Sequence, residues 1–341
     1  MSELRTSANQ PIVDVRNLEV AFVSRDSTVN AVNGVNFTLQ PGEVLCILGE
    51  SGSGKSVTLR ALMRLLPRQA RTSGCVTVAG NDVLSLTERK LADLRGSEIA
   101  MIFQEPAVSF DPIYTVGRQI TESIRRHENV SGAEAQRRAL DIFERVQIPS
   151  PERRLRAFSH ELSGGMRQRA MIALALACQP SVLLADEPTT ALDATVQIQI
   201  LLLLRELQRE LGMAVIFVTH DVGVAVEIAD RIAVMYAGRF VETGPTTKII
   251  NSPQHPYTKG LLSSTVNSSS RGQRLKAIPG SPPDMTQLPI GCAFGPRCEH
   301  VRPACRVQVP AETQIASVDD HTVRCLLVDG FLELTENPNV N

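Results

Sequence analysis

The sequence has 341 residues, a length that fits one large domain with a smaller one, or two domains. Hydrophobic residues make up 43 %, ample for a core, and the net charge of −1 excludes a global field that would draw the chain to nucleic acid. The longest apolar runs, near residues 170–178 and 198–204, are shorter than a membrane span, and residues 1–10 lack the apolar centre of a signal peptide. We therefore expect a protein made and kept in the cytosol, where any membrane role goes through a partner.

Short strands dominate the first hundred residues. Apolar or alternating runs predict strands at residues 12–15, 18–23, 35–39, 42–48, 74–80 and 99–103. Leucines at helical spacing predict helices at residues 57–66 and 87–96.

From residue 115 the pattern becomes mainly helical. Apolar residues recur every three or four positions in segments 116–126, 133–146, 167–178, 195–211 and 222–229. Strands are predicted at residues 181–186, 214–219, 232–236 and 240–243, the last two as a hairpin around Ala237 and Gly238. Strands that alternate with helices predict an α/β fold with a largely parallel sheet and helices on both faces.

A glycine-rich loop between a predicted strand and a predicted helix is the strongest motif in the chain. Its spacing is that of a phosphate-binding loop, in which backbone N–H groups and the helix dipole attract anionic oxygens. Lys55 would reach the outer phosphates and Ser56 would place its hydroxyl on Mg²⁺. A turn that matches by chance is the alternative. The residues expected to bind nucleotide here are Gly49, Glu50, Ser51, Gly52, Ser53, Gly54, Lys55, Ser56 and Val57.

Polar residues end three other predicted strands. Asp186 can hold magnesium, and Glu187 beside it can polarise an attacking water. Gln104 can orient water next to the metal, and the spacing of His220 after the acidic pair favours a role at the same site. The alternatives are a solvated acidic pair, a surface glutamine and a structural histidine.

Ser163, Gly164 and Gly165 begin a predicted helix and form a second candidate anion site. An ordinary N-cap followed by two glycines is the alternative. Because one phosphate loop already serves one nucleotide, a second site makes sense if it serves a nucleotide held by another subunit.

The segment after residue 263 has a different amino-acid composition. Residues 266–272 are serine-rich and residues 278–289 proline-rich, which predicts a linker, and residues 291–327 are expected to form a separate small element. This element contains Cys292, Cys298, Cys305 and Cys325, whereas Cys46, Cys75 and Cys178 fit a core. Four cysteines with little hydrophobic core suggest a bound metal. The spacing favours a [4Fe–4S] cluster over zinc, and four free thiols are the remaining alternative.

Together these motifs resemble the ATP-binding cassette ATPases over about residues 12–260. Within that family the motif sequences are similar to those of the ATPase subunits of oligopeptide and dipeptide importers. The methionine at position 166 also resembles the residue typical of this subfamily. The matching stretches are FQEP at 103–106, LSGGMRQR at 162–169, DEPTTALDAT at 186–195, the segment 219–239 and HPYTKGLL at 255–262. The sequence of residues 107–112 departs from the one usual in this subfamily, which leaves the substrate open.

The resemblance implies a P-loop NTPase (RecA-like) core with a mixed or parallel sheet, an antiparallel β subdomain and an α-helical subdomain at about 105–178. Residues 1–263 would form the nucleotide-binding domain, and residues 264–341 a linker and the cysteine-rich extension, where some members carry an iron–sulfur cluster. ATP and Mg²⁺ are the implied cofactors. Lys55, Ser56, Gln104, Asp186, Glu187 and His220 would act on one nucleotide, with Phe22 stacking on adenine or else serving as a core residue.

The resemblance also implies partners. Two cassettes, preferably two related subunits, would pair head to tail, with Ser163 and Gly165 acting on the partner's nucleotide and Asp193 at the seam. Two integral membrane permease subunits would bind near Gln104 and segment 105–160, and an extracytoplasmic solute-binding protein would act indirectly. The chain would then lie at the cytoplasmic face of the inner membrane. A soluble cassette ATPase and a redox-sensing ATPase remain as alternatives.

Overall fold

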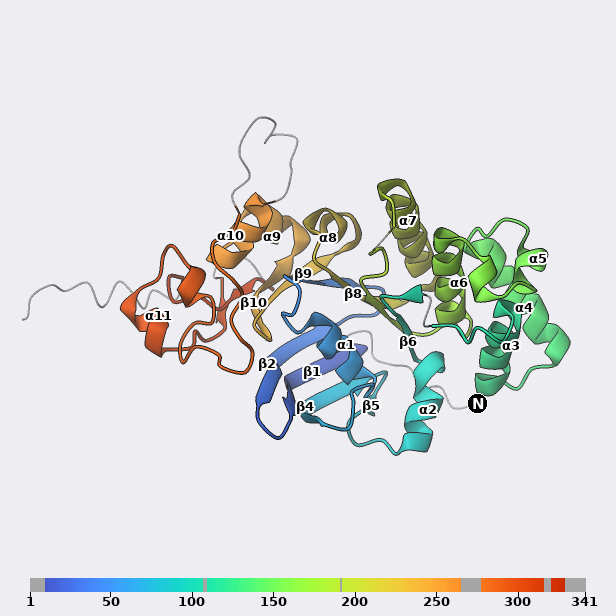
Figure 1. Cartoon of the computed structure of the whole chain (residues 1–341), viewed down its shortest axis with the longest axis horizontal. Coiled ribbons are helices and arrows are strands. Elements are labelled where there is room, and N and C mark those ends of the chain that lie inside the picture. The colour runs from blue at the N-terminus through green and yellow to red at the C-terminus, as the bar shows by residue number, and fades with distance from the viewer. Residues whose placement is uncertain (1–9, 107–108, 191, 265–276, 316–319, 329–341) are drawn as a thin grey trace, which may run out of the picture.

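Two β-sheets and the helices around them make up the computed structural model (Figure 1). The structure describes residues 10–106, 109–190, 192–264, 277–315 and 320–328. Residues 107 and 108, Ala191 of the ALD motif and the serine-rich stretch 266–272 therefore lie outside the described residues. The α/β prediction is confirmed, with helices of the described part on both sides of a mixed sheet.

The smaller sheet is antiparallel, in the order β2-β1-β4-β5. Its strands are β1 (Val13–Val23), β2 (Thr28–Leu39), β4 (Ala70–Val78) and β5 (Asn81–Asp82). The two strands predicted at 12–15 and 18–23 are one continuous strand, β1. Its pairing with β2 continues across a bulge, where the register shifts between Val15 and Leu18 around Asn17, whose φ is 48°. This bulge returns Leu18 to the buried face that Val15 occupies.

The larger sheet has eight strands in the order β11-β12-β10-β9-β3-β8-β7-β6. Its parallel centre consists of β6 (Ile99–Ile102), β7 (Val182–Asp186), β8 (Ala214–Thr219), β3 (Val44–Leu48) and β9 (Arg231–Tyr236). These strands are almost continuously buried, as expected when both faces of a sheet are covered. β10 (Arg239–Pro245) pairs antiparallel with β9, which confirms the predicted hairpin.

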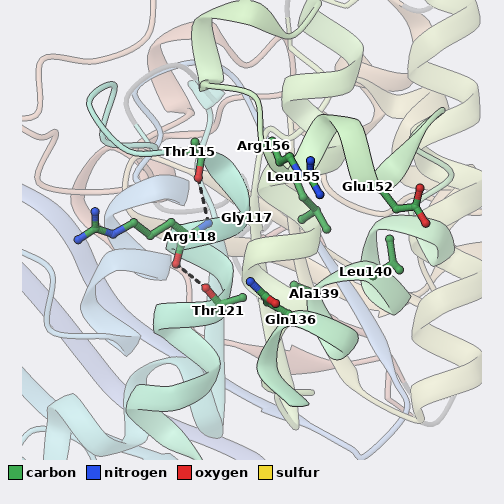
Figure 2. Close-up of a pocket in the computed structure, with 10 residues that line it drawn as sticks. All are labelled: Thr115, Gly117, Arg118, Thr121, Gln136, Ala139, Leu140, Glu152, Leu155 and Arg156. Carbon is green, nitrogen blue, oxygen red and sulfur yellow. Dashed lines mark hydrogen bonds between the residues drawn. The ribbon is translucent and has the colours of Figure 1, made fainter. Parts of the chain in front are cut away.

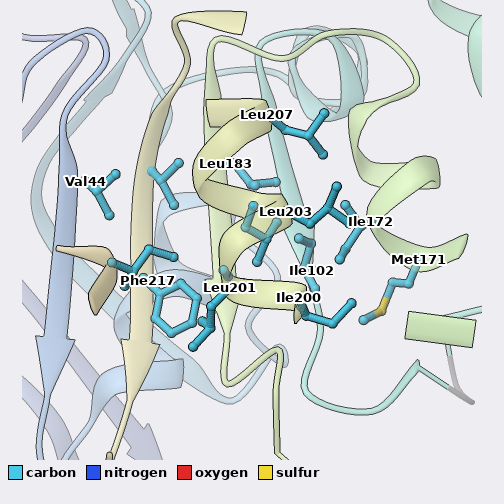
Figure 3. Packing of buried hydrophobic residues seen from close by; sticks show 14 of the residues in the cluster. Val44, Ile102, Met171, Ile172, Leu183, Ile200, Leu201, Leu203, Leu207 and Phe217 are labelled. Carbon is cyan, nitrogen blue, oxygen red and sulfur yellow. The ribbon is translucent and has the colours of Figure 1, made fainter. Parts of the chain in front are cut away.

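Helices cover the large sheet. They include α1 (Lys55–Leu62), α2 (Glu88–Ser97), α7 (Ala194–Leu211) and α8 (Val222–Ile228). Figure 3 shows how α7 is held: Leu203 and Leu207 project from the helix among Leu183, Ile102 and Ile172, in one buried cluster. This packing fixes the helix behind β7, the strand that ends in Asp186.

A group of helices follows β6 and lies at one end of the molecule (Figure 1). It consists of α3 (Val116–His127), α4 (Gly132–Arg145), α5 (Pro151–Leu155) and α6 (Gly164–Leu176), with a 3-10 turn at Ser159–Glu161. Thr115, Ser131 and Ser163 cap three of these helices, each accepting a backbone N–H with its hydroxyl oxygen. Within the described residues, no helix is both long and apolar enough to cross a membrane.

The C-terminal extension lies at the opposite end (Figure 1). After α9 (Thr246–Asn251) and α10 (Pro256–Ser263), it contains a 3-10 turn at Gly295–Arg297, α11 (Pro303–Val307), β11 (Thr313–Gln314) and β12 (Thr322–Val323). β12 pairs with β10, so the extension continues the main sheet instead of forming the separate element expected from sequence. Beside this pairing the buried His321 Nε2 lies 2.9 Å from Glu242 Oε1.

Candidate functional site

The phosphate loop joins β3 to α1, and two of its glycines are required by close contacts. Gly54 has a φ of 106°, and a Cβ there would collide with the carbonyl oxygen of Ala31. A Cβ on Gly49 would collide with the carbonyl oxygen of Met235. The loop is therefore pressed against the neighbouring backbone, and α1 begins directly after it at Lys55.

Lys55 is bent back onto the loop that precedes it. Its Nζ donates to the carbonyl oxygens of Gly49 and Glu50, each at 2.8 Å. The residue is 4 % exposed, and this burial lowers the pKa of its ammonium group. The positively charged Lys55 side chain is thus held at the opening of the loop, where it can attract an anion.

Ser56 and Asp186 join the start of α1 to the end of β7. Ser56 Oγ donates to Asp186 Oδ1 at 2.6 Å. Burial raises the pKa of the Asp186 carboxyl, and the hydrogen bond from Ser56 opposes that rise. Among the described residues Asp186 Oδ2 and Ser53 Oγ are buried without a hydrogen-bond partner. An unsatisfied buried carboxylate oxygen next to a hydroxyl is a donor set that suits Mg²⁺.

Glu187 collects three polar side chains around one carboxylate. Its Oε2 accepts from Thr190 Oγ1 at 2.9 Å, lies 3.2 Å from His220 Nδ1 and accepts from Gln104 Nε2 at 3.5 Å. Glu187 itself has a φ of 45°, an uncommon conformation for a residue that is not glycine. The structure thus brings together the three strand-end residues predicted from sequence and adds Thr190, whose only sequence signal is its place three residues after Glu187.

A cavity of about 650 Å³ runs over these groups, within the usual size of a ligand pocket. Most of its lining was predicted from sequence: the loop residues Glu50, Ser51, Gly52, Gly54, Lys55, Ser56 and Val57, with Gln104, Glu187 and His220. Sequence analysis missed Thr190, Val29, Ala31, Leu261 and Met285. Phe22, expected to stack on adenine, is not among the lining residues described and packs against the core of the antiparallel sheet.

Comparison with known proteins decides the family. Residues 32–190 match the ABC transporter family model, and residues 241–305 match the C-terminal region of oligopeptide/dipeptide transporters. A peptide import ATP-binding protein of Brucella melitensis is 46 % identical over 327 residues, covering 92 % of this chain and 96 % of that protein. The chain belongs to the ATP-binding cassette (ABC) family, in the group of oligopeptide and dipeptide importer ATPases. A second peptide import ATP-binding protein, from Brucella abortus, is 50 % identical to this ABC ATPase over 296 residues, covering 86 % of this chain and 89 % of the relative.

Solved structures agree with this ABC assignment. A dimeric ATP-binding cassette in a post-hydrolysis state, bound to ADP and Pi, has a TM-score of 0.62 and 30 % identity, covering 69 % of this chain and 98 % of that one. A component of an ABC transporter complex from Clostridium perfringens has a TM-score of 0.62 and 28 % identity, covering 72 % and 92 %. Cassettes of this family are ATPases, so this chain is an ATPase of the ABC type.

The second predicted anion site of the ABC ATPase lies away from its own nucleotide cavity. Ser163 caps α6 by accepting from the Met166 N–H at 3.4 Å, and neither Ser163 nor Gly165 is among the residues that line the cavity. Ser163 is exposed, and Gly165 faces Val196 of α7. Asp193 caps α7 by accepting from the Val196 N–H at 3.0 Å. Ser163 and Asp193 are thus exposed at the surface of this chain.

The four cysteines of the extension meet at one small cavity. Burial raises the pKa of the thiols of Cys292 and Cys298, and the neighbouring backbone N–H groups oppose that rise. Burial raises the pKa of the Cys325 thiol to about 11. Within the described part of the chain, however, no three potential ligand groups are placed to hold a metal ion together. The metal centre predicted from sequence therefore stays a prediction.

A second cavity, of about 440 Å³, lies among the helices of the ABC helical region (Figure 2). A Cβ on Gly117 would clash with the carbonyl oxygen of Leu155, so this glycine lets α3 and α5 approach closely. The cavity falls within segment 105–160, where the permease was expected to bind. Its lining comprises Thr115, Gly117, Arg118, Thr121, Gln136, Ala139, Leu140, Glu152, Leu155 and Arg156.

Proposed function

We propose that this chain is the ATP-hydrolysing subunit of a membrane ABC importer for peptides or related small solutes. The observation that carries the proposal is its near full-length identity, 46–50 %, to proteins named for peptide import. The contacts at Glu187 supply the chemistry that such a subunit needs. The solute itself would be recognised by the permease and a solute-binding protein.

The phosphate loop holds ATP in this proposal. Phosphate oxygens replace the loop carbonyls on Lys55, and the loop N–H groups, the dipole of α1 and Ser53 add further attraction. Ser56, Asp186 and Gln104 would hold Mg²⁺, which would neutralise negative charge on the outer phosphates. The unpartnered Oδ2 of Asp186 and the 2.6 Å contact from Ser56 support this assignment.

Glu187 is the proposed general base, because its carboxylate faces the nucleotide cavity and is oriented by two neighbours. Thr190 and His220 contact its Oε2, and Gln104, which contacts the same oxygen, would align the attacking water. The reaction is in-line phosphoryl transfer to water, in which positioning and charge stabilisation carry most of the rate.

The nucleotide sites are completed between two cassettes. Ser163 and Gly165 of one subunit contact the ATP of the other, and Asp193 lies at the seam, consistent with their position outside their own chain's cavity. We favour a related second subunit over an identical copy. ATP binding closes the pair, hydrolysis reopens it, and two permease subunits follow through contacts at α3–α5, which places this chain at the cytoplasmic face of the inner membrane.

The four clustered cysteines hold a metal centre in this proposal, a [4Fe–4S] cluster in preference to zinc. Their convergence on one small cavity supports it, because four thiolates are the usual ligand set of such a cluster. The centre would fix the fold of the extension and has no step in hydrolysis.

Copurification tests the proposal. The tagged full chain, expressed with the permease genes, should be recovered with integral membrane subunits, and the complex in proteoliposomes should take up peptide only when ATP is supplied on the cassette side. Lys55→Ala should abolish that uptake while the complex still assembles. Recovery of an active ATPase without membrane subunits would contradict the transport role and favour a soluble cassette ATPase.

A further inference from the structure

Glu50 places a negative charge inside a loop that is built to bind anions. It is the second residue of the loop, it lines the nucleotide cavity, and its backbone carbonyl oxygen accepts from Lys55 Nζ at 2.8 Å. An uncompensated carboxylate here would repel the phosphates of a nucleotide. The loop therefore needs a cation that neutralises Glu50 without occupying the phosphate position.

Arg297 of the C-terminal extension supplies this cation. Its Nη1 donates to Glu50 Oε2 at 2.8 Å and its Nη2 to Glu50 Oε1 at 3.1 Å, a two-pronged ion pair. The arginine side chain is 5 % exposed, and its Nε donates to the carbonyl oxygen of Pro279 at 2.9 Å. The guanidinium is thus oriented by its surroundings, and the pairing raises its pKa.

A second contact holds the backbone of the same residue. The Glu50 N–H donates to Tyr257 Oη at 3.0 Å, and Tyr257 packs against Tyr236 and Phe294 with ring centroids 4.5 Å and 5.4 Å away. Phe294 and Arg297 both belong to the short stretch between Cys292 and Cys298. This stretch is therefore linked to the phosphate loop in two ways. Arg297 binds the side chain of Glu50, and Phe294 packs against Tyr257, which binds the main chain of Glu50.

We propose that Arg297 is a positioning residue of the ATP site: by neutralising and holding Glu50, it lets the C-terminal extension set the affinity of the phosphate loop for nucleotide. The inference rests on the proposed function, in that the loop is taken to bind ATP. Arg297 acts on binding and not on the chemical step, since it touches Glu50 and none of the groups around Glu187.

The test measures Mg-ATP binding to the full chain in its complex by equilibrium dialysis, in a Glu187→Gln background that slows hydrolysis. Arg297→Ala should raise the Kd about tenfold, because it leaves one uncompensated charge near the phosphates. Adding Glu50→Gln to Arg297→Ala should restore the Kd, because the repelling charge is gone. In the complex with Glu187 intact, Arg297→Ala should raise KM for ATP and leave kcat nearly unchanged.

Arg324→Ala is the matched control. Arg324 also directly precedes one of the four cysteines and pairs with Glu312 at 2.8 Å, but this pair does not touch the loop. Its Kd should equal that of the parent. If Arg297→Ala fails to fold, Glu50→Gln alone decides the matter, since the amide keeps a hydrogen bond to Arg297 and should bind Mg-ATP at least as tightly as the parent.

Three results separate the outcomes. An unchanged Kd in Arg297→Ala, or a Kd that Glu50→Gln does not restore, would overturn the role of Arg297. A tenfold weaker Kd in Glu50→Gln alone would overturn charge neutralisation as its basis. Failure of the parent protein itself to bind Mg-ATP would instead contradict the proposed function.

Discussion

The hydroxyl of Ser56 and the carboxylate of Asp186 meet at 2.6 Å, although the two residues are 130 positions apart in the sequence. This contact links the phosphate loop to the strand end that carries Glu187, so the residues proposed to bind the cation and to activate water lie next to each other. In the described structure Asp186 Oδ2 is the buried oxygen of this pair that lacks a partner. It is the atom that a bound cation would satisfy.

Asp186→Asn should raise the Mg²⁺ concentration that gives half-maximal ATPase activity by about tenfold or more, because a neutral amide is a poorer ligand for a hard cation. A Mg²⁺ titration at saturating ATP measures this. The exposed Asp26, in the β1–β2 turn, gives the control variant Asp26→Asn, which should not change the Mg²⁺ requirement. Equal requirements in both variants would remove Asp186 from the cation site.

Two adjacent leucines of α7 provide a packing test. Leu203 is 2 % exposed and Leu202 is 55 % exposed. Leu203→Ala should lower the free energy of unfolding by about 2–5 kcal/mol, because it leaves a cavity beneath the helix. Leu202→Ala should change it by less than about 0.5 kcal/mol. Urea denaturation of both variants measures the difference, and similar losses would mean that α7 is packed differently.

The extension's cysteines make a prediction about colour and metal content. Anaerobically purified protein should be brown, with a broad absorbance in the visible blue, if a [4Fe–4S] cluster is bound. Cys292→Ser should lose that absorbance and the bound iron, whereas Cys75→Ser, at an exposed cysteine of β4, should retain both. A colourless preparation that contains stoichiometric zinc would rule out the cluster, and one without metal would leave four free thiols.

Stability should fall in mild acid because of His255. This buried histidine caps α10 by accepting the Tyr257 N–H on Nδ1, and burial lowers its pKa from 6.5 to about 3. Below pH 6.5 the unfolded chain binds this proton and the folded protein does not, so stability is lost as the pH falls toward 3. Between pH 7 and pH 5.5 the loss from this residue should be about 1 kcal/mol.

The comparison variant is His255→Asn, which keeps a capping acceptor and removes the titration. Denaturant unfolding at pH 7 and pH 5.5 should show a smaller decrease for the variant than for the parent. Glu242 and His321 lie next to this residue in both proteins, so the difference between the two isolates His255. An identical decrease in parent and variant would contradict the assignment.

Local signals account for most of what the sequence could predict. The phosphate loop is one contiguous motif, and Asp186 and Glu187 follow a clearly apolar strand. In an α/β fold the ends of parallel strands meet at one edge of the sheet, so the sequence also predicts that the loop and the two acids lie close together. The hairpin at Ala237 and Gly238 has the same origin. The roles predicted for these site residues still await the experiments above.

What escaped prediction depends on contacts between distant segments. Arg297 and Glu50 are 247 residues apart, and nothing in either neighbourhood indicates the other. β12 has two residues, too few for any periodic pattern, yet its pairing with β10 joins the extension to the main sheet. Met285 sits in a proline-rich stretch that reads as a linker, although its carbonyl oxygen accepts from the Asn30 N–H and the residue lines the nucleotide cavity.

The most direct test of the whole account is the turnover of Glu187→Gln in the intact transporter complex. ATP binding and phosphate release should be measured side by side for parent and variant. We predict that the variant retains Mg-ATP with the parent's affinity and releases phosphate at least about a hundredfold more slowly, the usual scale for loss of a catalytic base. A variant that hydrolyses ATP at the parent's rate would contradict the assignment of Glu187, and with it the mechanism proposed for this cassette.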